Sequence, residues 1–324
     1  MAAHLGVESY VLDVLGPGQR HLGPEAARWL ADLRGRVTAA AIDNMRRDAG
    51  LSGALDRLAA EGIETILLKG SALRLARLGM AGRYQCDVDV LVRRRDLERA
   101  AALLAGSGFR LDESYLDRQS LLDRHFHLGY ERQGAVVELH WDVDAPSPPG
   151  FVERLWEASR EVVLDGRRVR ALSPEHQLLF GCLHLSRHAF HGGLRWLADL
   201  RLQLELGGVA REAFAEEARV WPRRAVYCPL WLLAEHGAAM ARELGGDGGA
   251  DPLERLLLRR LTQPLLVAEP WLGIPSWRLE NAVRSWLFSE SSLPGLLAAV
   301  SGEGVSGKLR SWAARAAEEA EETV

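Results

Sequence analysis

Residues 86–92 read Cys-Asp-Val-Asp-Val-Leu-Val, and this stretch decides how the rest of the chain is interpreted. Its aliphatic and β-branched residues predict a largely buried strand over 87–92. Alternate side chains of a strand share a face, so Asp87 and Asp89 point the same way. Two buried carboxylates are costly without a cation, and a hard divalent metal is the usual solution. The alternative is a solvated strand edge, but the stretch favours a metal-binding strand.

A second informative stretch, residues 67–71, reads Leu-Leu-Lys-Gly-Ser. We expect a strand over 63–68 and a helix over 71–78. Backbone N–H groups at the start of a helix favour an anionic phosphate. Lys69 fits equally well as a phosphate ligand and as a side chain that keeps its charge in solvent. A metal-binding strand beside this turn indicates chemistry on a phosphate chain.

A third carboxylate fits the same plan, since residues 136–141 read Val-Val-Glu-Leu-His-Trp. If this strand lies beside the Asp87 strand, Glu138 joins the two aspartates. Three carboxylates can hold two metal ions about 3.5–4 Å apart, the spacing that clamps both oxygens of an in-line displacement. The alternative is an exposed position on an alternating strand. The expected role of Glu138 is to complete a metal site and to help deprotonate an acceptor hydroxyl.

In this order the motifs resemble those of the DNA-polymerase-β-like nucleotidyltransferase superfamily. Its pattern is Gly-Ser, a short helix, an Asp-x-Asp strand and a third acid between apolar residues. The matching positions here are Gly70, Ser71, Asp87, Asp89 and Glu138. The gap between the serine and the first aspartate is a little longer than usual and leaves room for a loop.

Within the superfamily, the chain is most similar to the bacterial nucleotidyltransferase family proteins. These carry Leu-Lys-Gly, an arginine ahead of the Asp-x-Asp strand, and a later acid-Leu-His-Trp. The counterparts here are residues 68–70, Arg83 and residues 138–141. The resemblance continues into residues 183–199 and covers roughly residues 50–205.

The resemblance implies a metal-dependent enzyme that moves a nucleoside monophosphate from a nucleoside triphosphate, such as ATP, to an acceptor and releases pyrophosphate. The acceptor would be a hydroxyl or phosphate of a small molecule or peptide. Two Mg²⁺ ions, with Mn²⁺ as an alternative, would be held by the catalytic residues Asp87, Asp89 and Glu138. Nucleotide binding would fall to Lys69, Gly70, Ser71 and Arg83, and the acceptor pocket would be lined by His140, His184, His188 and Arg195.

Three alternatives to these roles stay open. Arg83 could tie its loop to a carboxylate such as Asp87 instead of binding a phosphate. The same carboxylates could support phosphotransfer or hydrolysis, in which no nucleotide is retained on a product. The chain could also be a non-catalytic binding protein of a biosynthetic cluster, although the intact acidic residues argue against that.

Three histidines, His184, His188 and His191, are spaced i, i+4 and i+7 and share one face of a predicted helix. One interpretation is a zinc site completed by Asp199. The alternatives are the lining of an interdomain cleft and hydrogen bonding within a helical core. The Gly192-Gly193 pair is expected to end the helix, which disfavours the third histidine as a rigid ligand.

Composition narrows the class of protein. The chain has 324 residues, a net charge of −4, and 26% charged and 48% hydrophobic residues, which is ordinary for a globular protein. The lack of a basic surplus argues against nucleic acid as a partner. We expect no signal peptide, because the N-terminus lacks a basic region followed by an apolar segment, and no membrane span, because no window has eighteen uninterrupted apolar residues. Three scattered cysteines form no disulfide or zinc pattern, so we expect a cytoplasmic location. The sequence does not indicate an oligomeric state.

The predicted fold class is α/β (α+β): a nucleotidyltransferase core with a short mixed sheet, N-terminal helices and a C-terminal helical domain. The predicted domains are an N-terminal helical arm over 1–50, the catalytic core over 51–171 and a helical acceptor-binding domain over 172–324. Further strands are expected at 109–112, 125–131, 135–141, 161–164 and 168–171. Helices are expected at 24–47, 51–61, 96–104, 173–189, 193–206, 209–219, 224–243, 251–261 and 313–322.

Overall fold

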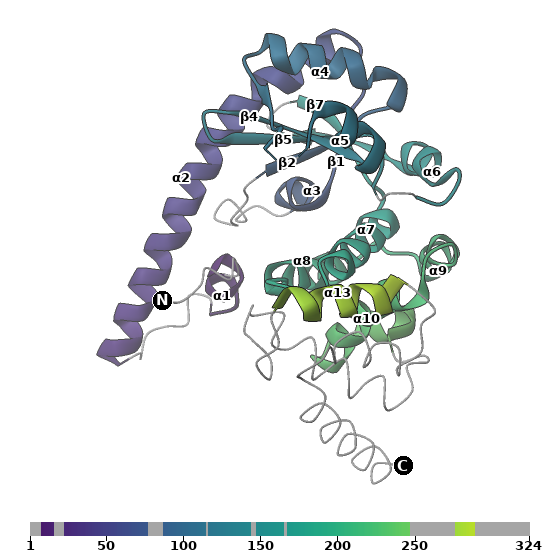
Figure 1. The fold of residues 1–324 in the computed structure, drawn as a ribbon. Coiled ribbons are helices and arrows are strands. Elements are labelled where there is room, and N and C mark those ends of the chain that lie inside the picture. Colours follow the sequence, from purple (N-terminus) through teal and green to yellow (C-terminus); the bar gives the residue numbers. More distant parts are fainter. Residues whose placement is uncertain are drawn as a thin grey trace. The chain divides into compact units, whose positions relative to one another are not determined.

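The computed structural model describes residues 8–15, 23–76, 87–114, 116–143, 147–164, 167–246 and 276–288 (Figure 1). The chain divides into two units. One unit comprises residues 6–177 and contains the whole sheet. The other comprises residues 1–5 and 178–324 and is helical where it is described. Each unit is treated by itself below.

The first unit is built on a seven-stranded mixed sheet in the order β3-β4-β5-β2-β1-β7-β6. The strands are β1 (Ile66–Leu67), β2 (Asp87–Leu91), β3 (Arg110–Leu111), β4 (His127–Arg132), β5 (Ala135–His140), β6 (Arg160–Leu164) and β7 (Arg167–Ala171). The pairs β2–β5 and β1–β7 are parallel, and the other neighbours are antiparallel. The predicted α/β fold with a mixed sheet is confirmed.

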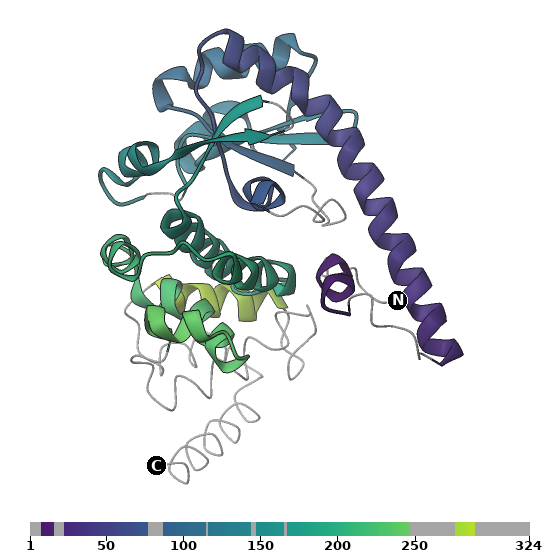
Figure 2. The ribbon, with the colours of Figure 1, turned by 180° about the vertical axis from the view of Figure 1, so that it is seen from behind.

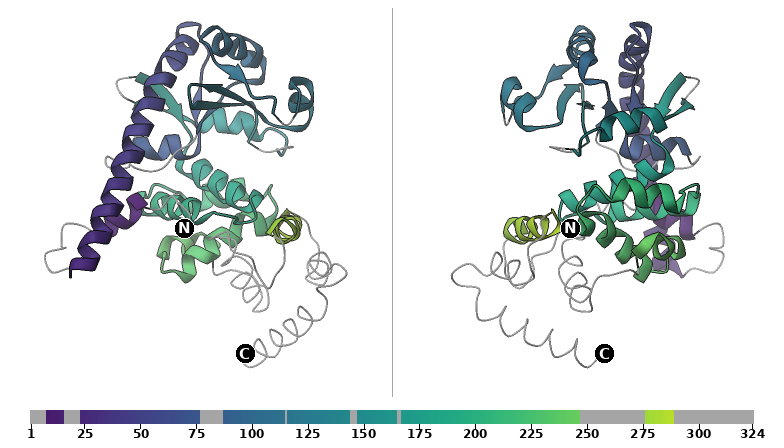
Figure 3. Two further views of the ribbon diagram at one scale, coloured as in Figure 1. Left: turned by 60° about the vertical axis from the view of Figure 1, so that its left-hand side comes forward. Right: turned by 90° about the vertical axis from the view of Figure 1, so that its right-hand side faces the viewer.

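The helices of this unit are α1 (Glu8–Leu15), α2 (Pro24–Ala60), α3 (Lys69–Ala76), the 3-10 turn η2 (Arg94–Asp96), α4 (Leu97–Gly106), α5 (Arg118–Arg124) and α6 (Phe151–Ala158). Some of them lie on each face of the sheet (Figures 1 and 3). The C-terminal part of α2 and the whole of α4 cover one face, and α3 lies against the other.

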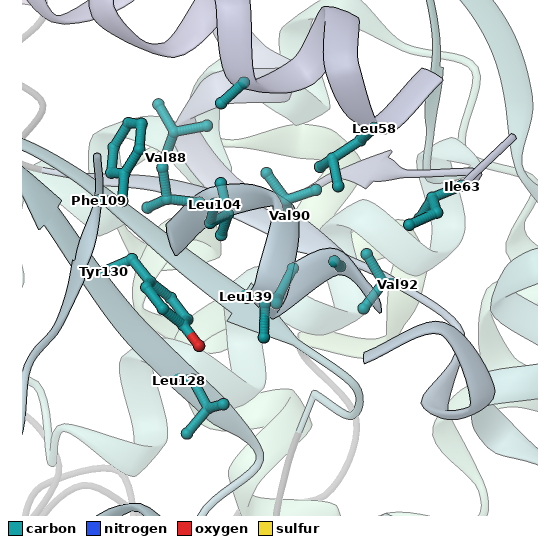
Figure 4. Close-up of a cluster of buried hydrophobic side chains, with 14 of the residues drawn as sticks. Leu58, Ile63, Val88, Val90, Val92, Leu104, Phe109, Leu128, Tyr130 and Leu139 are labelled. Carbon is teal, nitrogen blue, oxygen red and sulfur yellow. The ribbon is translucent and has the colours of Figure 1, made fainter. Parts of the chain in front are cut away.

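The hydrophobic core of this unit lies between the sheet and the pair α2–α4 (Figure 4). Strand alternation sends every second side chain to this side. Burial of each aliphatic side chain there contributes about 1.5–3 kcal/mol. The sheet supplies Val88, Val90, Leu128, Tyr130, Val137 and Leu139, and the helices supply Ala54, Leu58, Leu97, Ala100, Ala101 and Leu104.

The N-terminal helices differ from the prediction. Two helices were expected over 24–47 and 51–61, but α2 runs without interruption from Pro24 to Ala60 (Figure 2). A helix-interior glycine costs only about 1 kcal/mol relative to alanine. The buried Ala54 and Leu58 anchor the second half of the helix on the sheet, which outweighs the penalty at Gly50.

Two helices of this unit were not expected from the sequence. In α5, the side chain of Asp117 accepts a hydrogen bond from the backbone N–H of Ser120 at 3.0 Å, which caps the helix. In α6, Phe151 and Leu155 are fully buried and hold the helix against the unit. The helix α3 also begins at Lys69, two residues earlier than predicted.

The helix α7 (Pro174–Arg187) begins in the first unit and ends in the second. The other described helices of the second unit are α8 (Leu194–Leu206), α9 (Arg211–Ala218), α10 (Arg223–Glu235), α11 (Ala239–Ala241), the π-type turn η3 (Arg242–Gly246) and α13 (Ser276–Phe288). The helices predicted at 173–189, 193–206 and 209–219 are confirmed. The one predicted over 224–243 breaks at Gly237, whose φ is +87°. The predictions at 251–261 and 313–322 lie outside the described residues. No described helix is long and apolar enough to cross a membrane.

Candidate functional site

The register of β2 and β5 brings three acidic side chains onto the face opposite the core. The two strands are parallel neighbours, and Asp89 pairs with Glu138. Because paired residues share a face and alternate residues repeat it, Asp87 lies on that face as well. One carboxylate oxygen from each of the three residues lies within 4.8 Å of the others. The structure thus assembles the acidic cluster from the two strands that carry the sequence motifs.

Lys69 supplies positive charge to this acidic cluster. Its Nζ lies 2.6 Å from Asp89 Oδ1 and 3.5 Å from Glu138 Oε2. Burial acts to lower the pKa of Lys69, but the carboxylates of Asp89, Glu138 and Asp87 outweigh burial and raise the pKa. The ammonium therefore stays charged and offsets one of the three negative charges.

The backbone holds Lys69 in an unusual conformation. Its φ is +48°, in the left-handed region that non-glycine residues rarely adopt. Its carbonyl oxygen accepts a hydrogen bond from Gln177 Nε2 at 3.1 Å. This turn between β1 and α3 aims the side chain at the carboxylates. Gln177, which the sequence did not single out, is therefore part of the support of the site.

His140 lies beneath the acidic cluster and has no exposed surface. Its Nε2 is 3.0 Å from Asp89 Oδ1 and 3.2 Å from Glu138 Oε2. Burial acts to lower the pKa of His140, but the hydrogen bonds to Asp89 and Glu138 outweigh it and raise the pKa. Nε2 of this ring therefore orients the two carboxylates, and Nδ1 lies 3.3 Å from the backbone carbonyl oxygen of Asp142.

Glu138 is half-buried between Lys69 and His140. Burial acts to raise the pKa of Glu138, but the hydrogen bond from His140 and the charge of Lys69 outweigh it and hold the pKa below its ordinary range. The carboxylate is therefore ionised at neutral pH and able to accept hydrogen bonds or bind a cation.

His127 also lies beside Glu138, and the sequence alone did not predict it as a site residue. It pairs with His140 across the β4–β5 hairpin, and the two ring centroids are 4.9 Å apart. Burial lowers the pKa of His127 to about 4, so the ring is neutral at neutral pH. The two-residue turn at Gln133 and Gly134 could have revealed it, because such a turn fixes the register of the strands.

The predicted nucleotide-binding residues lie at the start of α3 where they are described. Gly70 and Ser71 are in the first turn of the helix, and both are buried. The N–H groups of a first turn have no partner within their own helix and favour an anion. Arg83 lies outside the described residues.

The predicted acceptor residues of the second unit form an aromatic cluster. His184 and His188 have ring centroids 4.6 Å apart, and each lies within 5 Å of the centroid of Trp196. The guanidinium of Arg195 lies 5.5 Å from the same ring. His191 Nδ1 lies 2.9 Å from Glu280 Oε1. Among the residues described, these histidines belong to neither of the two groups with metal-ligand spacing.

The chemistry of the acidic cluster fits a hard divalent cation. Carboxylate oxygens are the ligands that Mg²⁺ and Mn²⁺ prefer. Three of them converge within 4.8 Å, and Lys69 leaves two of the three negative charges without compensation from that side chain. A cation bound here would lie on the same face as the start of α3.

Comparison with known proteins identifies the class. Residues 2–237 match an uncharacterised nucleotidyltransferase family, so the match covers well over half of the chain. The chain therefore belongs to this family, and it is a member of the nucleotidyltransferase superfamily. A search among curated proteins found no match.

Two solved structures are similar to this chain. The antibiotic-resistance factor ANT(2'')-Ia is 18% identical, with 60% of this chain and 97% of that chain covered and a TM-score of 0.41. An antigenic nucleotidyltransferase-like protein from Paracoccidioides brasiliensis is also 18% identical, with 65% and 92% covered and a TM-score of 0.41.

Proposed function

We propose that this protein is a metal-dependent enzyme that transfers a nucleoside monophosphate from a nucleoside triphosphate to a hydroxyl or phosphate of a small molecule or peptide. The observation that carries the proposal is the convergence of Asp87, Asp89 and Glu138 on one face of two parallel strands. Membership of a nucleotidyltransferase family supports the class of reaction.

The three carboxylates have different environments, which suggests different roles. Asp89 is only 2% exposed and is held by Lys69 and His140, so it is the fixed metal ligand. Asp87 and Glu138 are more exposed and would complete the binding of two divalent cations. Such cations, when bound, neutralise phosphate charge and polarise the phosphoryl group. Glu138 would also accept a hydrogen bond from the acceptor hydroxyl and orient it.

The triphosphate would bind at the start of α3. Gly70 and Ser71 would present backbone N–H groups, and the helix dipole favours the negative charge. Lys69 begins the same helix, so its ammonium can contact the phosphates as well as the carboxylates. We propose Arg83 as a further phosphate ligand, because arginine binds phosphate through two parallel hydrogen bonds. The mild net charge of −4 favours a small or peptide acceptor over nucleic acid.

The proposal is tested by calorimetric titration of the protein with ATP, GTP, CTP and UTP, each with and without Mg²⁺. We expect Mg²⁺-dependent binding of at least one nucleotide by the wild type. Asp87→Asn should abolish this binding, since it removes one charge from the acidic cluster. Asp123→Asn is the matched control, because that carboxylate is exposed on α5 and belongs to neither metal-ligand group.

The products decide between transfer of a nucleotide and other phosphate chemistry. Release of pyrophosphate and an acceptor heavier by one nucleoside monophosphate would support the proposal. Release of inorganic phosphate alone would favour a phosphotransferase or hydrolase. If the folded wild type binds no nucleotide under any condition, the proposed transferase function is wrong.

A further inference from the structure

His127 is a partly buried imidazole whose hydrogen bonds are incomplete. Its Nδ1 is buried and has no hydrogen-bond partner among the described residues. Its Nε2 lies 3.8 Å from Glu138 Oε1, which is longer than a hydrogen bond. A buried polar group without its hydrogen bonds is costly, and a bound ion is one of the common reasons for such a group. The nitrogen that faces Glu138, Nε2, makes no hydrogen bond to that carboxylate and is the one that could accept a metal ion.

The groups around His127 have the spacing of metal ligands. His127, Glu138 and His140 each offer one donor atom, and the three atoms lie within 4.8 Å of one another. Zinc forms bonds of about 2.0–2.1 Å to nitrogen and oxygen, and at tetrahedral angles such ligand atoms lie roughly 3.3–3.4 Å apart. Glu138 Oε2 lies 3.2 Å from His140 Nε2 and Glu138 Oε1 lies 3.8 Å from His127 Nε2, so each carboxylate oxygen faces one of the two imidazoles.

The second nitrogen of His140 supports the same assignment. Its Nδ1 lies 3.3 Å from the backbone carbonyl oxygen of Asp142 and donates to it when protonated. A histidine that binds a metal almost always donates its other ring N–H to a carbonyl or carboxylate, which fixes the tautomer. In that tautomer the lone pair lies on Nε2, so a metal bound there would replace the hydrogen bonds that this nitrogen makes to Asp89 Oδ1 and Glu138 Oε2.

Space and charge also favour a cation at this position. The residue of β4 opposite Glu138 is Gly129, so no side chain of that strand lies across from the carboxylate. Asp87, Asp89 and Glu138 carry three negative charges, and Lys69 offsets one of them. A cation beside Glu138 therefore meets a net negative charge.

We propose that His127, Glu138 and His140 bind Zn²⁺ as a site distinct from the hard-metal cluster with which it shares Glu138. Imidazole nitrogen suits zinc, whereas Mg²⁺ takes oxygen ligands. Two histidines and a glutamate form a three-ligand set that leaves the fourth tetrahedral position open. The site does not depend on the proposed transfer reaction, because metal binding is measured without nucleotide.

The experiment is a titration of the full-length, chelator-treated protein with Zn²⁺ by calorimetry and with Co²⁺ by visible absorption. We expect one Zn²⁺ per chain and a Co²⁺ spectrum of tetrahedral geometry with nitrogen ligands. His127→Ala should weaken Zn²⁺ binding by more than the roughly 10–100-fold that follows loss of an outer hydrogen bond to a metal ligand. His125→Ala is the matched control, because His125 is exposed just before the same strand, and it should bind as the wild type does.

Asp87→Asn distinguishes this site from the acidic cluster. It should retain zinc binding, since Asp87 is not a member of the histidine group. Loss of zinc binding in Asp87→Asn with retention in His127→Ala would place the metal among the carboxylates and overturn the proposal. Failure of the folded wild type to bind Zn²⁺ would overturn it as well. Either result leaves Mg²⁺-dependent nucleotide binding as a separate measurement.

Discussion

At the scale of single residues, the site depends on the positive charge of Lys69, which offsets the negative charge of the neighbouring carboxylates. The ammonium approaches a nearly buried carboxylate, and the backbone adopts a positive φ to place it there. Strained backbone of this kind costs about 1–3 kcal/mol and persists where the surroundings fix it. The hydrogen bond from Gln177 is one contact that fixes it here. We infer that Lys69 serves as the internal counter-ion of the metal-free protein.

Replacement of Lys69 should make the free energy of unfolding depend on the presence of a divalent metal ion. In the presence of a chelator, Lys69→Ala should lower the free energy of unfolding by about 3 kcal/mol, because Asp89 is left buried without its cationic partner. Saturating Mg²⁺ or Mn²⁺ should restore part of the loss, since a ligand that binds only the folded state stabilises it. Urea unfolding with and without metal measures both effects.

Two further variants separate charge from backbone strain. Lys69→Gly should be less destabilising than Lys69→Ala, because glycine adopts positive φ without penalty. Arg168→Ala removes an exposed ion pair with Glu161 and should cost less than about 1 kcal/mol. Equal stability of wild type and Lys69→Ala in chelator would contradict the counter-ion role.

At the scale of elements, strand alternation made much of the site predictable. The pattern around Asp87 and Asp89 is that of a strand with one apolar and one acidic face, and β2 has these two faces. The sequence could not show that β5 is the neighbour of β2, because that pairing joins residues about fifty positions apart. His127 could be recognised only through the register of the β4–β5 hairpin, which the turn at Gln133 and Gly134 fixes.

The helices were less predictable for a different reason. Local propensity treats Gly50 as a break in the pattern, whereas burial of Leu58 against the sheet is a tertiary effect. Similarly, α6 follows a proline-rich loop and is held by packing of Phe151. Its eight residues form too short a helix to be stable by propensity alone.

Two helical glycines allow the effect of helix propensity on stability to be separated from the effect of side-chain packing. Gly53 in α2 is exposed and a Cβ atom there would meet nothing within 4 Å, so Gly53→Ala should raise the free energy of unfolding by about 0.5–1 kcal/mol. Gly181 in α7 is the opposite case, because a Cβ atom would lie 2.6 Å from Leu200 Cδ2. Gly181→Ala should therefore destabilise the protein. Urea denaturation of the two variants checks the opposite signs, and destabilisation by Gly53→Ala would contradict the first.

At the scale of the whole molecule, the two units carry different groups of functional candidates. The unit of residues 6–177 carries the acidic cluster, Lys69 and the histidine pair of the sheet. The helical unit carries the aromatic cluster around Trp196 and the buried thiols of Cys182 and Cys228. The chemistry proposed for the metal ions therefore belongs to a single unit.

The thiol of Cys182 reports on the integrity of the helical unit. Burial raises the pKa of Cys182 far above its ordinary value, so almost no thiolate forms in the folded protein. At pH 8, iodoacetamide should modify Cys182 at least about 100-fold more slowly in the native protein than in denaturant, since each pKa unit lowers the thiolate fraction tenfold. Peptide mapping by mass spectrometry measures the two rates at this residue. Equal rates would show that the helical unit opens readily.

The short turn between β4 and β5 has a consequence for finding related chains. His127 and His140 meet because each lies the same number of residues from the turn at Gln133 and Gly134. Insertion of a single codon in that turn would separate the two imidazoles while every ligand stayed present in the sequence. A search for related chains that checks only residue identities would include such a chain. A search that also requires the two histidines to be thirteen positions apart would exclude it.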